Sequence, residues 1–271
     1  MSLPVGLAAA FLHIPYITHD SDAIPGLTNR IISRWARLHA VSLPKEIYKY
    51  PANKTVTVGV PIGKHFLPVT KSSQASYKEE LGLGNYKQVI FITGGGLGAQ
   101  RLNEVVAQVM PELLKNYPDL VAVHAVGRDH KQSMRHLYDK NLATADMPRV
   151  IIKGFIDDLY RYSGAADVII TRAGATNLAE FAAQSKACVI VPNPQLTGGH
   201  QVKNAQALAA HKAAIIIQEQ QLIRYPETLS DTISRLLDHP SDRQQLGHRL
   251  SQFAYLNATE HLAQLILSMV S

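Results

Sequence analysis

Residues 168–204 carry side chains whose types and spacing could bind a nucleotide. The β-branched apolar run at 168–171, Val-Ile-Ile-Thr, is typical of a buried parallel strand. A turn of small residues at 172–175 follows, and residues 177–183 place apolar side chains on one helical face. The N–H groups and dipole at such a helix start favour a phosphate. Glu180 comes one helical turn later, where a carboxylate can accept two O–H groups from a ribose.

A second polar loop follows the next apolar strand, predicted over residues 187–191. This loop reads Thr-Gly-Gly-His-Gln at 197–201. Strand, helix and strand make a β-α-β unit, and the ligands of such sheets bind at the carboxyl ends of the strands. The two loops then offer one side to a diphosphate, one to a ribose and one to a sugar. An ordinary β-α-β unit with a surface glutamate fits the same pattern, but the polar loops favour a nucleotide site.

The composition limits the class of protein. The chain has 271 residues, of which 46% are hydrophobic and 18% charged, as in ordinary soluble globular proteins. The net charge of +6 fits an anionic ligand, an anionic membrane surface or nucleic acid. The sequence contains no Lys/Arg block and no aromatic ladder among basic residues, which makes nucleic acid the weaker interpretation. The single Cys188 lies in an apolar strand and is expected to be a core residue. No segment is long and apolar enough to predict a membrane-spanning helix.

A second glycine-rich turn follows the apolar run at 88–93. It reads Gly-Gly-Gly-Leu-Gly-Ala at 94–99 and precedes a helix predicted over 100–115. Glycines there let a phosphate approach the backbone at the helix start. The turn also matches the Gly-x-Gly-x-x-Ala dinucleotide fingerprint, but a dehydrogenase needs an acid at the end of its second strand. The nearest acid after the strand predicted at 120–126 is Asp129, which lies too far along, so a nicotinamide cofactor is the weaker interpretation.

The remaining pattern predicts short elements on both sides of these turns. The predicted strands lie at 16–18, 41–43, 55–58 and 213–217, and residues 150–159 are predicted to form a strand and a loop. The predicted helices lie at 4–12, 27–38, 77–81, 229–237, 242–253 and 261–270. The sequence Asn-Ala-Thr-Glu at 257–260 predicts a capping box for the last helix.

Several of these stretches resemble the MurG family of glycosyltransferases, family 28. The resemblance is most specific over Arg172-Ala-Gly-Ala-Thr-Asn-Leu-Ala-Glu180 and over His-Gln at 200–201 with Asn-Ala at 204–205. It continues at His19 with Pro-Gly-Leu-Thr-Asn at 25–29, and at Phe-Ile-Asp-Asp-Leu at 155–159. It covers nearly the whole chain. The family moves N-acetylglucosamine from UDP onto lipid I, which makes lipid II for peptidoglycan.

The resemblance implies an α/β fold of the GT-B architecture with two Rossmann-like domains, the amino-terminal one incomplete. Residues 1–64 are expected to form a partial acceptor-side domain, and residues 65–255 the UDP-sugar-binding domain. Residues 256–271 are expected to form a final helix that crosses back to the first domain. The implied reaction inverts the anomeric centre by direct displacement, without a metal or a cofactor. A helix start then stabilises the UDP leaving group.

The resemblance also implies roles for individual residues. The backbone of Ile156 reads the uracil edge, Glu180 holds the ribose, and His200 with Gln201 binds the sugar hydroxyls. The donor-binding set is Gly95, Gly96, Gly98, Ile156, Arg172, Gly174, Ala175, Thr176, Asn177, Glu180, His200, Gln201 and Asn204. The acceptor-side set is Asp20, Asp22 and Asn29, and His19 is the candidate general base.

The loop at 19–22, His-Asp-Ser-Asp, allows a second interpretation. Asp20-Ser-Asp22 spells the Asp-x-Asp pattern with which metal-dependent glycosyltransferases hold a divalent cation on the donor diphosphate. Three residues match often by chance, and Pro-Gly at 25–26 with Asn29 favours the metal-free loop of the family. His19 fits either a polar role in the cleft or a packed loop position.

The chain departs from the family pattern at several positions. Asp-Ser-Asp at 20–22 replaces Glu-Gln-Asn, Gly63 replaces an arginine beside Lys64, and Gly96 replaces a serine. The family begins with a strand and a Gly-Gly-Thr-Gly-Gly-His loop, thought to touch the acceptor diphosphate and supply the general base, and this sequence contains neither. We therefore expect this chain alone to bind the donor but to transfer little or no sugar. We also expect an open sheet edge and an exposed apolar face.

Three functional interpretations remain open from the sequence. The first is a MurG-type enzyme recorded without its start, and the second is a donor-binding subunit completed by a separate acceptor-binding chain. The third is another UDP-sugar enzyme, such as a glycolipid synthase or a nucleotide-sugar epimerase. The expected partners are UDP-N-acetylglucosamine, undecaprenyl-linked lipid I and a membrane surface. The expected location is peripheral, on the cytoplasmic face of the bacterial plasma membrane.

Overall fold

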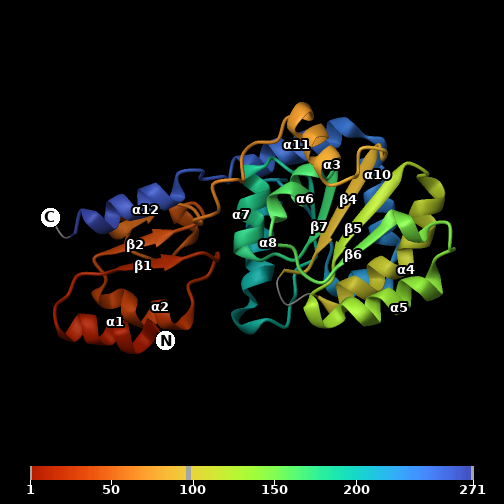
Figure 1. Ribbon diagram of the computed structural model, residues 1–271. Helices are drawn as coiled ribbons and strands as arrows, with labels where there is room; N and C mark the ends of the chain where they lie inside the picture. Colours follow the sequence, from red (N-terminus) through yellow and green to blue (C-terminus); the bar gives the residue numbers. More distant parts are fainter. Residues whose placement is uncertain (1, 96–98, 270–271) are drawn as a thin grey trace.

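The computed structural model describes residues 2–95 and 99–269, which contain two separate parallel sheets (Figure 1). The smaller sheet has the order β1-β2-β3. Its strands are β1 (Ile17–Asp20), β2 (Leu38–Val41) and β3 (Thr55–Thr57). Helices α1 (Ser2–Phe11) and α2 (Leu27–Ile32) lie on one face of this sheet, and α12 (Ala258–Leu267) lies beside β2 on the other. The last helix of the chain therefore lies against the sheet formed by the amino-terminal residues.

The larger sheet has six parallel strands in the order β6-β5-β4-β7-β8-β9. In chain order within this sheet the arrangement is 3-2-1-4-5-6, that of a Rossmann fold. The order reverses between β4 and β7, and the loops after these two strands diverge at that switch point. The strands are β4 (Gln88–Thr93), β5 (Leu120–Ala125), β6 (Val150–Lys153), β7 (Val168–Thr171), β8 (Cys188–Ile190) and β9 (Ile215–Ile216).

Helices cover both faces of the larger sheet (Figure 1). They are α3 (Lys71–Glu80), α4 (Gln100–Asn116), α5 (Lys131–Asn141), α6 (Leu159–Ala165), α7 (Ala175–Ala183), α8 (His200–Ala210), α9 (Glu219–Arg224), α10 (Glu227–Asp238) and α11 (Pro240–Ser251). Strands covered on both faces become continuous apolar runs, which explains why β4, β7 and β8 could be predicted from the sequence.

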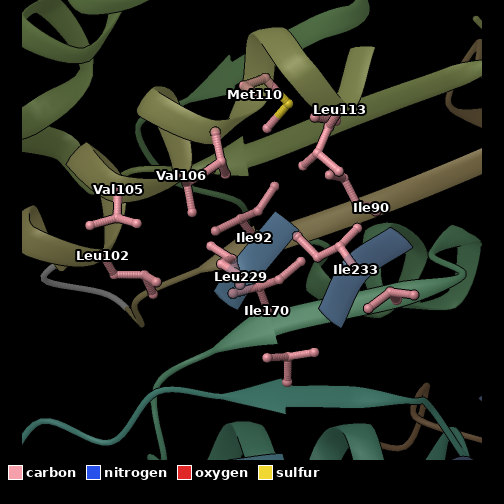
Figure 2. Packing of buried hydrophobic residues seen from close by; sticks show 14 of the residues in the cluster. Ile90, Ile92, Leu102, Val105, Val106, Met110, Leu113, Ile170, Leu229 and Ile233 are labelled. Atoms are coloured by element: carbon pink, nitrogen blue, oxygen red, sulfur yellow. The ribbon is translucent and has the colours of Figure 1, made fainter. Parts of the chain in front are cut away.

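The core beneath the glycine-rich turn is built by α4 and α10 packing against β4 and β7. Ile90, Ile92 and Ile170 project from the strands toward apolar residues of α4, including Met110 and Leu113, and all five side chains are buried (Figure 2). This packing fixes the direction in which α4 leaves the sheet. The helix start that follows the glycine-rich turn is therefore held by a rigid core.

Several element predictions were wrong in detail. The helix predicted over 27–38 ends at Ile32, and β2 occupies 38–41 instead of 41–43. This strand was missed because the polar His39 interrupts its apolar pattern. His39 is nevertheless buried, since its ring makes a hydrogen bond with Thr18 Oγ1 at 2.8 Å and stacks on Tyr50 at 4.0 Å. The capping box was also wrong: Asn257 precedes α12 but makes no capping hydrogen bond through its side chain. Helices α5 and α8 were not predicted.

Candidate active site

A pocket of about 270 Å³ opens where β4, β5 and β6 end, beside the start of α7. It brings together five residues of the predicted donor set from three separate stretches of the chain. These five are Gly95, Ile156, Thr176, Asn177 and Glu180. The pocket lies at the carboxyl edge of the sheet and at its switch point, the usual ligand position in this fold.

Glu180 is the acidic residue at the α7 side of this pocket. Burial raises the pKa of its carboxyl group to about 7, since desolvation penalises the charged form. In this position the carboxyl group is partly protonated near neutral pH. Its charged form is stabilised when a ligand donates hydrogen bonds to it. The two hydroxyls of a ribose are suitable donors.

Gly95 and Gly174 belong to the two predicted phosphate turns. Gly95 has a positive φ of 86°, and a Cβ added there would meet no atom of the described residues within 4 Å. Gly174, the residue before α7, has ordinary extended backbone, and a Cβ added there would also meet nothing within 4 Å. The space beside Gly174 adjoins the free N–H groups at the start of a nine-residue helix, which suits an anion. Gly96 and Gly98 lie outside the described residues.

Arg172 does not line the pocket, although it was predicted to bind the donor. Its guanidinium is buried, donates to the Val191 carbonyl at 3.1 Å and pairs with the Glu219 carboxylate. Glu219 is also buried and pairs with Arg101 of α4 at 3.1 Å. One carboxylate thus braces α4 and the end of β7, the two elements on either side of the switch point. This pairing could not be predicted from local spacing, because Glu219 lies 47 residues beyond Arg172.

Asn204 is also placed differently from its predicted role as a donor-binding side chain. It is buried, and its Oδ1 accepts from the Ala23 N–H at 2.8 Å. Its Nδ2 donates to Asp22 Oδ1 at 2.7 Å and to the Ala173 carbonyl at 3.0 Å. These three bonds occupy the amide and connect the amino-terminal loop to the turn before α7. Asp22, predicted on the acceptor side, is therefore part of a contact between the two sheets' loops.

His200 and Gln201 are the first two residues of α8, directly after the loop that follows β8. His200 Nδ1 is 3.7 Å from Asp22 Oδ2, too far for a hydrogen bond, and it is the one buried side-chain polar atom of the described residues without a partner. Gln201 Oε1 accepts from the Asn193 N–H at 2.9 Å, which orders the loop after β8. Ala175 lines a smaller apolar cavity shared with Leu178 and the amino-terminal segment, and not the pocket that contains Glu180.

The remaining residues of the acceptor-side prediction form a hydrogen-bonded group at the end of β1. Asp20 is buried and accepts from Asn29 Nδ2 and from the Tyr50 hydroxyl, each at 2.8 Å. His19 Nε2 donates to the Gly59 carbonyl at 2.9 Å, and its Nδ1 lies 3.4 Å from the Ser21 hydroxyl. Both ring nitrogens thus have protein partners. This arrangement gives His19 a structural role and does not support it as general base.

The carboxylates of the Asp-x-Asp pattern do not converge. Asp20 is directed to Asn29 and Tyr50, whereas Asp22 is directed to Asn204. Within residues 2–95 and 99–269, no group of three or more histidine, cysteine or acidic side chains could hold a metal ion. In the same part of the chain, no helix is long and apolar enough to cross a membrane.

Comparison with known proteins shows the family of this chain. Residues 89–262 match the glycosyltransferase family 28 C-terminal domain. The chain belongs to glycosyltransferase family 28. This family 28 match spans β4 to α12 and therefore includes every residue of the pocket described above.

Relatives of this family 28 chain agree over nearly its whole length. It is 31% identical to the UDP-N-acetylglucosamine--N-acetylmuramyl-(pentapeptide) pyrophosphoryl-undecaprenol N-acetylglucosamine transferase of Geotalea uraniireducens, over 96% of this chain and 68% of that protein. It is 32% identical to the enzyme of the same name from Geobacter sulfurreducens, with the same coverage. The crystal structure of Acinetobacter baumannii MurG superposes with a TM-score of 0.73 at 30% identity, covering 98% of this chain and 71% of that one. The expected GT-B fold is confirmed.

Two features of the family 28 site were missed by sequence reasoning. Glu219 carried no local signal, as described above. Phe155 lines the pocket with 43% of its side chain exposed, and the Arg128 guanidinium lies 4.2 Å from its ring centroid. An exposed aromatic ring beside a nucleotide pocket is a surface on which a base can stack. A single phenylalanine in a mixed stretch did not distinguish this position from the core.

Proposed function

We propose that this chain transfers N-acetylglucosamine from UDP-N-acetylglucosamine to lipid I, making lipid II for peptidoglycan. The observation that carries the proposal is the buried Glu180 in a pocket at the switch point, beside an uncapped helix start. This combination suits a ribose and a diphosphate joined together. The names of the relatives at 31–32% identity supply the donor sugar and the acceptor.

In the proposed reaction an acceptor hydroxyl oxygen attacks C1 of the donor sugar as the bond from C1 to the diphosphate oxygen breaks. The hydroxyl proton passes to a general base, UDP leaves with the bonding pair, and the configuration at C1 inverts. The N–H groups at the start of α7 would stabilise the charge that develops on the diphosphate. Glu180 would hold the ribose and the Ile156 backbone the uracil. Gln201 would reach a sugar hydroxyl through its side-chain amide hydrogens.

Calorimetry with UDP-N-acetylglucosamine, with and without EDTA, tests the donor half of this proposal. We expect binding that does not change on chelation, because Asp20 and Asp22 are directed to protein groups. Failure to bind UDP or its sugar conjugate would contradict the proposal. Loss of binding with EDTA would instead restore the metal interpretation of residues 20–22.

Transfer of radiolabelled sugar to a lipid I analogue tests the acceptor half. A glycerolipid acceptor serves as the comparison, because a glycolipid synthase would use the same donor. We expect label in the lipid I product only, and at a low rate, as the sequence predicts for this chain alone. Label in the glycerolipid product without label on lipid I would contradict the proposed acceptor.

We also propose a peripheral position at the cytoplasmic face of the plasma membrane. Several apolar residues of α1 and α2 are exposed, notably Phe11 at 83% and Leu27 at 72%. Exposed arginines lie in the same segment, at Arg30, Arg34 and Arg37. Apolar groups next to basic ones suit an anionic lipid surface. Sedimentation with phosphatidylglycerol vesicles, compared with neutral phosphatidylcholine vesicles, should show binding to the anionic vesicles that high salt weakens; equal recovery in the supernatant would contradict it.

A further inference from the structure

The turn between β7 and α7 is connected to a segment more than 150 residues earlier through one side chain. Asn204 donates to the Ala173 carbonyl on one side and to the Asp22 carboxylate on the other. Its Oδ1 also accepts from the Ala23 N–H. All three contacts are between 2.7 and 3.0 Å, and Asn204 is 4% exposed. An amide so satisfied, with a charged partner, resists rearrangement.

The residue that Asn204 holds is next to the candidate diphosphate position. Ala173 directly precedes Gly174, and the N–H groups that would bind an anion begin with the helix at Ala175. On the other side of the same turn, Arg172 is fixed by Glu219 and the Val191 carbonyl. The turn is therefore held by Arg172 and by Asn204 of α8, and Asn204 is itself bonded to Asp22 and Ala23 in the loop after β1. Only the second of these connections includes the amino-terminal segment.

We propose that Asn204 and Asp22 are positioning residues for the diphosphate site. Through them the amino-terminal segment sets the position of the turn before α7, and so sets donor affinity without contacting the donor. This inference rests on the proposed function for the identity of the ligand. It does not require that either side chain touches the donor.

The position of His200 fits this arrangement. Its Nδ1 is turned toward Asp22 Oδ2 but stops at 3.7 Å, while Asn204 takes Asp22 Oδ1 at 2.7 Å. The short hydrogen bond of Asp22 is therefore made with the Asn204 amide and not with the His200 imidazole. The connection to the turn consequently depends on an acceptor oxygen at residue 22 and not on a charge pair with His200. An asparagine at position 22 retains such an oxygen, whereas an alanine does not.

The first experiment measures amide hydrogen exchange in the ligand-free chain, and it is independent of donor binding. We expect residues 174–178 to exchange about tenfold faster in Asn204→Ala and in Asp22→Ala than in the parent. Asp22→Asn should exchange at close to the parent rate. Lys203→Ala, an exposed neighbour on α8, is the matched control and should also match the parent. Unchanged exchange in both alanine variants would overturn the inference, whether or not the chain binds UDP.

The second experiment compares UDP with uridine by calorimetry. We expect about tenfold weaker UDP binding in Asp22→Ala and in Asn204→Ala, with a smaller loss for uridine, because Ile156 and Glu180 lie farther from the turn than the N–H groups that would bind the diphosphate. The double variant should be no weaker than Asn204→Ala, since both act through one connection. Equal losses for uridine and UDP, or additive losses in the double variant, would overturn the inference. A loss in Asp22→Asn as large as in Asp22→Ala would assign the effect to the charge beside His200 and would also overturn it.

Failure of the proposed function gives a different result. If the parent binds neither UDP nor uridine, the donor assignment is wrong, and the exchange rates still decide whether residue 22 holds the turn. If Asn204→Ala does not fold, Asp22→Ala and Asp22→Asn are compared with the parent instead. Asp22 is partly exposed, so replacing it removes fewer buried contacts.

Discussion

Glu180 shows how a residue useful for binding can cost stability in the free protein. Its carboxyl group is largely buried, and the pKa is raised to about 7 because the charged form loses solvation. Between about pH 4.5 and 7 the folded state therefore holds a proton that the unfolded state has released. Stability consequently falls as the pH rises through this range. A ligand that donates hydrogen bonds to the charged carboxylate offsets this cost.

We predict that Glu180→Ala weakens UDP binding more than Asp158→Ala does. A hydrogen bond to a charged acceptor contributes about 1.5–3 kcal/mol, so the first change should reduce affinity by about tenfold or more. Asp158 precedes α6, makes no capping hydrogen bond and lies 3.8 Å from Arg161 on the surface, so its removal should leave affinity near that of the parent. Calorimetry with UDP makes the comparison. Parent-like affinity in Glu180→Ala would remove Glu180 from the site.

Uridine affinity should rise as the pH increases from 6 to 8. The deprotonated Glu180 carboxylate accepts ribose hydroxyls more strongly than the neutral acid, and its pKa of about 7 places the change in this window. Uridine is the probe because it carries no titrating phosphate. Glu180→Gln is the control and should bind uridine with little pH dependence. A parent profile as flat as that of Glu180→Gln would show that the carboxylate does not bind the ribose.

At the scale of elements, the Glu219 carboxylate connects α4 to the end of β7 by pairing with Arg101 and Arg172. We predict that Glu219→Gln destabilises the fold by about 3–5 kcal/mol, because Arg172 would stay buried without its anion. The urea midpoint is the measurement. Asp139→Asn is the control: its pair with Arg135 is more than half exposed, and its loss should cost about 1 kcal/mol or less. Equal shifts of the midpoint in the two variants would contradict the brace.

The elements that could be predicted from the sequence are those whose pattern reflects two-sided burial. β4 was predicted with its correct ends, and the turn at 172–175 was correctly placed after the buried strand β7. The buried Cys188 is confirmed as a core residue. β2 was shifted because His39, polar but buried, interrupted the apolar run. Its burial depends on partners from other strands, which a local pattern does not contain.

The same reason explains which site residues could be predicted. Glu180 lines the pocket one helical turn after the start of α7 and could be placed from local spacing, whereas Ile156 was placed by the family resemblance. Arg172 and Asn204 carry the same family signature, yet their side chains are occupied by Glu219 and by Asp22. These partners lie 47 and 182 positions away in the chain. Only the folded chain shows whether a polar side chain in a motif binds a ligand or the protein.

At the scale of the whole molecule, the two sheets are connected by the chain segment after β3 and by the segment before α12. These segments touch where Gly59 meets Tyr255. Gly59 has a φ of +85°, and a Cβ added there would lie 2.3 Å from Tyr255 Cβ. Its carbonyl also accepts from His19 Nε2. The relative position of the two sheets therefore depends on Gly59, at which the two connecting segments are in close contact.

We predict that Gly59→Ala destabilises the protein well beyond the cost of its backbone conformation. Gly82→Ala is the matched control, because Gly82 has a similar φ of +70° but open space where a Cβ would lie. The control should lose about 1–2 kcal/mol from the left-handed conformation alone. Gly59→Ala adds a contact with Tyr255 that only a movement of one segment can relieve, so its thermal midpoint should fall several degrees further. It should also raise hydrogen exchange in β1, which is attached to the displaced segment through His19. Equal midpoints in the two variants would mean that the segments separate at little cost, and that the sheets are held together elsewhere.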